Sequence, residues 1–142
     1  GSEMCIRDRF NLPYHSVCTT STHDMTPLRN WWKEDPEKTQ RYYNHVLQRI
    51  GEAPDECTAE IVAQIISNHL KTRSMLTIIP LQDWFAMDDS IKRKDIESER
   101  INVPANSTHY WRYRMHITLE QLLQADNLNN KIVSLIKEAG RK

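Results

Sequence analysis

The stretch SVCTTSTHDM, residues 16–25, decides the fold, because it ends a predicted strand on an imidazole and a carboxylate. Its first five residues are uncharged and rich in β-branched side chains, which is typical of a short strand. A helix signal follows at once, with Thr26 as the expected cap and Pro27 at the first helical position. His23 and Asp24 therefore lie at the carboxyl end of a strand.

A second strand is predicted at SMLTIIPL, residues 74–81, which is short, apolar and unbroken. Such a run is typical of a strand covered on both faces, as in parallel sheets. Asp35 and Thr58 are expected to cap two further helices. The helices between the strands are predicted over residues 27–34, 36–50 and 59–71.

The second strand is followed by a predicted loop, QDWFAMDD, residues 82–89, and by a charged segment. Thr118 and Gln121 form a capping-box pattern before one helix, and an amphipathic helix over 129–140 ends at Gly140. Strands that alternate with helices predict a parallel α/β arrangement. Two strands alone leave open edges, so the sequence is interpreted as part of a larger α/β domain.

The bulk composition excludes several classes of function. The chain has 142 residues, with 19 basic and 19 acidic side chains, which argues against binding to nucleic acid or to an anionic membrane. No apolar run approaches the roughly 20 residues of a membrane helix. Three cysteines without a C-x-x-C pair indicate a reducing, cytoplasmic setting. His109 and His116 match no usual metal-ligand spacing, so no metal site is predicted.

The first nine residues, GSEMCIRDR, show no periodicity and resemble the translated end of a transposon adapter. The alternative is an ordinary disordered terminus. Residues 1–9 are therefore expected to be a leader, and residues 10–142 the folded part.

Two polar pairs follow the predicted strands, His23–Asp24 after the first and Gln82–Asp83 after the second. Ligands in parallel α/β folds bind beyond the carboxyl ends of strands, so the two pairs form one candidate site. Alternative roles stay open: a cap or turn for Asp24, packing for His23, and a loop anchor for Asp83. The segment HYWRYRMH, residues 109–116, is interpreted as a buried aromatic stretch with paired arginines.

Three motifs in this order, STHD (21–24), IIPLQDW (78–84) and RINVPAN (100–106), carry a resemblance to a known family. The chain resembles the 4-α-glucanotransferases of glycoside hydrolase family 77, the amylomaltases or disproportionating enzymes. These motifs are most similar to those of the branch of the family that includes the plant cytosolic enzyme. The resemblance implies the C-terminal portion of a (β/α)₈ barrel, with residues 15–22 as the seventh strand and 74–81 as the eighth.

The resemblance also implies a reaction and its residues. The family transfers α-1,4-glucan segments with retention, through a nucleophilic carboxylate and an acid/base about 5 Å away. Asp24 matches the family's third carboxylate, which stabilises the transition state, while His23 and Asn102 match groups that bind the sugar. Gln82 and Asp83 are further candidates for substrate contact. The implied partners are maltose, maltooligosaccharides and glycogen- or starch-like glucans, and no cofactor is implied.

The family's nucleophile and acid/base have no counterpart in this sequence. Asp83, Asp88 and Asp89 follow the second strand and match neither role. We therefore expect the 142-residue chain to be inactive by itself. A non-catalytic sugar-binding or interaction module, or a piece that associates with a separate N-terminal half, are the alternatives, and the oligomeric state stays open.

Overall fold

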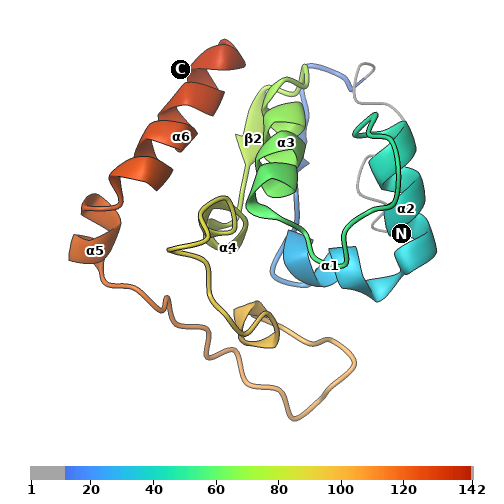
Figure 1. Cartoon of the computed structure of the whole chain (residues 1–142). Coiled ribbons are helices and arrows are strands. Elements are labelled where there is room, and N and C mark those ends of the chain that lie inside the picture. Colours follow the sequence, from blue (N-terminus) through green and yellow to red (C-terminus); the bar gives the residue numbers. More distant parts are fainter. Residues whose placement is uncertain (1–11, 142) are drawn as a thin grey trace.

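The computed structural model describes residues 12–141, so the expected leader over residues 1–9 lies outside the described residues. Strands β1 (Val17–Thr19) and β2 (Leu76–Ile78) form a parallel two-stranded sheet. Val17 lies opposite Leu76, and Thr19 opposite Ile78. The predicted α/β class is confirmed, with strands that are shorter than expected (Figure 1).

Three helices connect the two strands: α1 (Leu28–Glu34), α2 (Pro36–His45) and α3 (Ala59–Leu70). Two predicted caps are confirmed, because the Asp35 side chain accepts from the Lys38 N–H and the Thr58 side chain from the Ile61 N–H. Helix α2 ends at His45, before the predicted end at residue 50. In the turn that follows, the carbonyls of Arg49 and Gly51 accept hydrogen bonds from the Asn44 side-chain amide.

The start of α1 differs from the prediction in one detail. Pro27 occupies the cap position without a side-chain cap bond, so Thr26 is not the cap. The Leu28 N–H instead donates to Asp83 Oδ1 at 2.9 Å. The Asp83 carboxylate, 55 residues away in sequence, thus accepts a hydrogen bond at the helix start where the sequence predicts the Thr26 hydroxyl as acceptor.

The hydrophobic core lies between α3 and the elements around it. One face of α3 is fully buried, and side chains of α1, α2 and the segment after β2 pack against it: Ile61, Val62, Ile65, Ile66, Trp32, Tyr42, Phe85 and Met87. On the sheet, Cys18 is buried. The opposite face of the sheet is open, with Val17, Leu76 and Ile78 exposed by 57%, 49% and 58%.

The chain after β2 forms α4 (Leu81–Phe85), a 3₁₀ turn η1 (Glu97–Glu99), α5 (Leu119–Leu123) and α6 (Asp126–Glu138). The loop predicted over residues 82–89 is wrong at its start, because Pro80 lies at the cap position and the chain turns into α4. The capping box of Thr118 and Gln121 is confirmed. Helix α6 contacts α3. None of the helices in the described residues could cross a membrane.

Arg141 ties the end of α6 to the turn between α3 and β2. Its guanidinium donates to the carbonyls of Leu70, Thr72 and Ser74 at 2.5, 2.9 and 2.8 Å, and to that of Met75 at 3.3 Å. One planar group with five donors can satisfy several carbonyls at once, which a lysine ammonium cannot do from a single point.

We expect Arg141→Ala to lower the free energy of unfolding by about 1–2 kcal/mol, because several charge-assisted hydrogen bonds at a half-buried site are lost. Arg141→Lys should recover less than half of this loss. Urea titrations followed by far-UV circular dichroism measure the change. Equal midpoints for wild type and Arg141→Ala would contradict a structural role for the guanidinium.

Candidate active site

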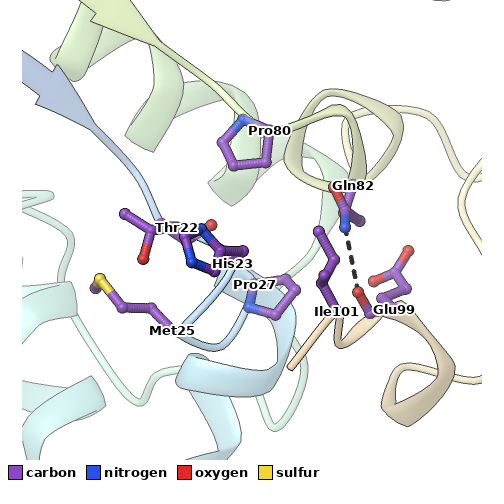
Figure 2. Close-up of a pocket in the computed structure, with 9 residues that line it drawn as sticks. Thr22, His23, Met25, Pro27, Pro80, Gln82, Glu99 and Ile101 are labelled. Atoms are coloured by element: carbon purple, nitrogen blue, oxygen red, sulfur yellow. Dashed lines mark hydrogen bonds between the residues drawn. The ribbon is translucent and has the colours of Figure 1, made fainter. Parts of the chain in front are cut away.

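The polar residues that follow the two strands lie together at the carboxyl end of the sheet. Because β1 and β2 are parallel and in register, the segments after Thr19 and Ile78 leave the sheet side by side. His23 and Gln82 line one small cavity of about 90 Å³ at this edge, together with Pro27, Pro80 and Ile101 (Figure 2). The structure therefore brings the two predicted segments together.

Asp24 is presented to solvent by a tight turn. The Met25 N–H donates to the Thr22 carbonyl at 3.1 Å, so His23 and Asp24 are the two central residues of the turn. The side chains of His23 and Asp24 are about half exposed, at 52% and 55%. Asp24 also lines an open depression of about 340 Å³, which is within the usual size of a ligand site.

Three residues predicted for the site meet at the Asp24 carboxylate. Asn102 Nδ2 donates to Asp24 Oδ1 at 2.7 Å, across a sequence separation of 78 residues. His23 Nε2 lies 3.1 Å from Asp24 Oδ2. Each carboxylate oxygen thus has one protein partner, and since an oxygen can accept two hydrogen bonds, both retain capacity for a ligand hydroxyl.

Asp83, a candidate for substrate contact, is buried and fully engaged by the protein. It is 1% exposed. Its Oδ2 accepts from the hydroxyls of Thr20 and Ser21 at 2.5 and 3.1 Å, and its Oδ1 from the Leu28 N–H. Burial raises the pKa of the Asp83 carboxyl, and the three hydrogen bonds oppose that rise. This geometry gives Asp83 the role of an anchor that joins both strand ends to α1.

Gln82 is also largely enclosed, at 5% exposure, although it lines the small cavity. Its Nε2 donates to the backbone carbonyl of Glu99 at 3.2 Å (Figure 2). Gln82 therefore connects α4 to the segment that carries Asn102. Direct contact of Gln82 with a ligand stays a prediction.

Trp111, which belongs to the segment predicted to be buried, lies beside His23 at the site. Trp111 is 60% exposed and Tyr110 is 71% exposed, so the expectation of a buried aromatic stretch is wrong for these two. The Trp111 ring centroid lies 5.1 Å from that of His23. Arg112 covers Tyr110 from 4.8 Å, a cation–π contact that needs no buried environment. The alternation of aromatic and basic residues was the available signal.

Both histidines of the segment 109–116 lie within hydrogen-bond distance of backbone carbonyls. A ring nitrogen of His109 lies 3.0 Å from the Ile101 carbonyl, and one of His116 lies 2.5 Å from that of Ile91. Within residues 12–141 there is no group of three His, Cys, Asp or Glu side chains that could hold a metal ion. Burial raises the pKa of the Cys57 thiol, which makes it a poor nucleophile.

Comparison with known proteins gives a consistent result at the level of sequence. The profile of the family described as 4-alpha-glucanotransferase, glycoside hydrolase family 77, matches residues 3–120. A 4-alpha-glucanotransferase of Oryza sativa subsp. japonica, DPE2, is 39% identical over 128 residues, which are 90% of this chain and 14% of that protein. A 4-alpha-glucanotransferase of Chlamydia trachomatis is 31% identical over 123 residues, 84% of this chain and 22% of that protein.

A solved structure shares the fold. The amylomaltase from Streptococcus agalactiae, determined in complex with acarbose, matches with a TM-score of 0.67 and 18% sequence identity. The match covers 92% of this chain and 23% of that chain. The chain thus spans between about one seventh and one quarter of the length of these proteins.

Proposed function

Because the chain belongs to the 4-alpha-glucanotransferases of glycoside hydrolase family 77, we propose that it forms part of an enzyme that moves α-1,4-glucan segments to the 4-hydroxyl of an acceptor sugar. The similarity to the rice and chlamydial glucanotransferases supports this assignment. The donors and acceptors are maltose, maltooligosaccharides or larger glucans.

Within that enzyme, β1 and β2 are the seventh and eighth strands of a (β/α)₈ barrel. Two observations support this placement. The strands are parallel and joined by helices, as in a βαβ unit. The open face of the sheet carries Val17, Leu76 and Ile78, the kind of branched residues that fill a barrel interior. Completion of the barrel would remove this apolar face and the strand edges from water.

The observation that carries the functional proposal is the meeting of His23, Asp24 and Asn102 at the carboxyl end of β1. In barrels of this type the active site lies at that end of the strands. The carboxylate is half exposed and lines a depression, and both of its oxygens can still accept a hydrogen bond. A packing residue would be enclosed, as Asp83 is.

Each of the three residues has a chemical role in the proposed reaction. The transition state of glycosyl transfer is positively charged at the sugar ring, so the negative charge of Asp24 favours it over the neutral bound sugar. His23 and Asn102 hold the carboxylate in place through its two oxygens. Their remaining polar atoms can bind sugar hydroxyls, and since all three are held before the sugar arrives, little reorganisation is needed.

The nucleophile and the acid/base of the retaining mechanism must come from outside the 142 residues. Asp83 is enclosed and engaged, and Asp88 holds Ser90 through hydrogen bonds to its backbone N–H and its hydroxyl. The second candidate function, a sugar-binding module without catalysis, is favoured by this lack of matching carboxylates. The two proposals share the site at Asp24 and differ only in what completes it.

Incubation with maltotriose separates activity from binding. We expect the purified 142-residue chain to release no glucose and to form no longer oligosaccharides, because only one of the three carboxylates of the reaction is present. Thin-layer or high-performance anion-exchange chromatography detects the products. Glucose release together with longer products would contradict the proposed division of the site between this chain and the rest of the enzyme.

A further inference from the structure

Glu99 is a buried acid with no part in the mechanism described above. It is 2% exposed, and its Oε2 has no hydrogen-bond partner. Its nearest cation is Arg29 of α1, with Nη1 at 3.5 Å from Oε2. An enclosed carboxyl is costly unless it is paired or neutral, so its presence three residues before Asn102 calls for a physical reason.

The chain between Arg93 and Asn102 is attached to α1 and α4 at several points. Arg29 Nη1 donates to the Arg93 carbonyl at 2.6 Å, and Asn30 Nδ2 donates to Glu97 Oε1 at 3.0 Å. Arg29 and Asn30 of the short helix α1 are both buried, at 7% and 4% exposure. Gln82 of α4 holds the Glu99 backbone carbonyl. The Glu99 side chain is the most enclosed of these attachments.

These contacts lie between two parts of the proposed site. Asp24 precedes α1 by a few residues, and Asn102 follows Glu99 by three. Any shift of the segment relative to α1 therefore changes the distance between Asn102 Nδ2 and Asp24 Oδ1. We propose that Glu99 is a positioning residue: its enclosed side chain packs the segment 97–103 against Arg29 of α1, a contact that we call the latch, and thereby holds Asn102 against Asp24.

The latch has a pH dependence of defined sign. Burial raises the pKa of Glu99 from its usual 4.5 to about 7. The groups that face it are Arg29 of α1 and Arg93, which precedes the segment 97–103, and both favour the charged form. Asp83 of α4 opposes it, and Tyr113 lies close enough to be affected by its charge.

With these values the closed segment keeps a proton that an opened, hydrated Glu99 releases between pH 4.5 and about 7. Rising pH through this window therefore favours opening. The closed segment is most stable in the acid part of the window, where Glu99 is neutral and the desolvation penalty is absent.

The test is amide hydrogen exchange in the 142-residue chain, without sugar or turnover. The backbone N–H groups of Glu99 and Arg100 donate to the Ile96 and Glu97 carbonyls at 3.2 and 3.3 Å, so they report opening of the segment. At about pH 5, Glu99→Ala should accelerate their exchange about tenfold, while the amides of α3 are unchanged.

The matched variants separate a latch from general packing. Glu99→Gln keeps the shape of the neutral acid, so it should protect the segment like wild type at about pH 5 and keep that protection at about pH 8. Wild type should lose up to about 10²-fold in protection over the same range, after correction for intrinsic exchange. Glu97→Ala removes the exposed partner of Asn30, so it should change the exchange rate by about threefold or less.

A spectroscopic readout connects the latch to the site. The side-chain amide resonances of Asn102, assigned with Asn102→Ser, should shift in Glu99→Ala and titrate with Glu99 in wild type but not in Glu99→Gln. This measurement is made in the His23→Gln background, which removes the imidazole beside Asp24.

Three results would overturn the proposal: unchanged exchange of Glu99→Ala at position 100, equal acceleration by Glu97→Ala, or loss of protection across α3 as well, which would make Glu99 a core residue. The inference depends on the proposed function only for the role of the Asp24–Asn102 pair. Since the readouts involve no glucan, a failure of the latch is distinct from a failure of the transferase assignment.

Discussion

Asp83→Ala is expected to lower the free energy of unfolding by about 3 kcal/mol or more, because three buried donors lose their acceptor at once. The hydroxyls of Thr20 and Ser21 and the N–H of Leu28 all donate to this carboxylate. A buried donor without a partner typically costs about 1–3 kcal/mol, and the hydroxyls can recover part of this by rotating. The enclosed site also leaves a cavity when the carboxyl is removed.

The effect is large relative to the stability available. A domain of ordinary size is stable by only about 5–15 kcal/mol, and a two-stranded sheet with an open apolar face is expected to be at or below the lower end. Asp83 joins the end of β1, the start of α1 and α4, so its loss separates the elements that form the site edge. We therefore expect the depression at Asp24 to lose its shape together with the fold.

Urea titration at low temperature, followed by far-UV circular dichroism, measures the change. Asp83→Asn keeps the shape and one acceptor oxygen, so it should cost less than half as much. Asp89→Ala is the matched control, because Asp89 follows the same helix but is largely exposed and pairs with Lys92. A surface ion pair contributes about 1 kcal/mol at most. Similar midpoints for Asp83→Ala and Asp89→Ala would contradict the anchoring role.

The features that could be predicted from the sequence are those with a local signal. Asp35, Thr58 and the Thr118–Gln121 pair cap helices within four residues of themselves, so their patterns suffice. The two strands were recognisable from β-branched and apolar runs, and their parallel pairing from the helices between them. That topology alone predicts that the polar residues lie together at the carboxyl end of the sheet.

The features that could not be predicted depend on partners far apart in the chain. Thr26 carries the stronger cap signal, yet Asp83, 55 residues from Leu28, supplies the bond. The same long-range bonds enclose Asp83 and leave Asp24 exposed, a distinction invisible in two similar carboxylates after two similar strands. Trp111 was assigned to the interior from composition, and only the tertiary structure places it beside His23.

The largest functional effect is expected from Asp24→Asn in a complete enzyme. A chimera in which residues 12–141 replace the matching segment of the rice 4-alpha-glucanotransferase provides one, since that segment is 39% identical to this chain. We expect kcat for maltotriose disproportionation to fall by about 10²–10³-fold, the range seen when one fixed group that stabilises a transition-state charge is removed.

The physical reason lies in when the charge is needed. Asparagine has almost the size of aspartate, so the sugar can still bind, and KM should change by much less than kcat. The positive charge of the sugar ring develops only in the transition state, where a neutral amide no longer stabilises it. The amide of asparagine would in addition turn a donor toward Asn102 Nδ2 or His23 Nε2, which now face carboxylate oxygens.

Asp55→Asn is the matched control in the same chimera, because it makes the same chemical change at an exposed position in the loop before α3. It should leave both kinetic constants unchanged, and the unmutated chimera sets the reference. A loss of tenfold or less in kcat for Asp24→Asn, or a loss confined to KM, would mean that the carboxylate contributes to binding or structure alone. The arrangement of Asp24 between His23 and Asn102 argues for the larger effect, because a carboxylate that only bound sugar would not require two partners to fix both of its oxygens before the sugar arrives.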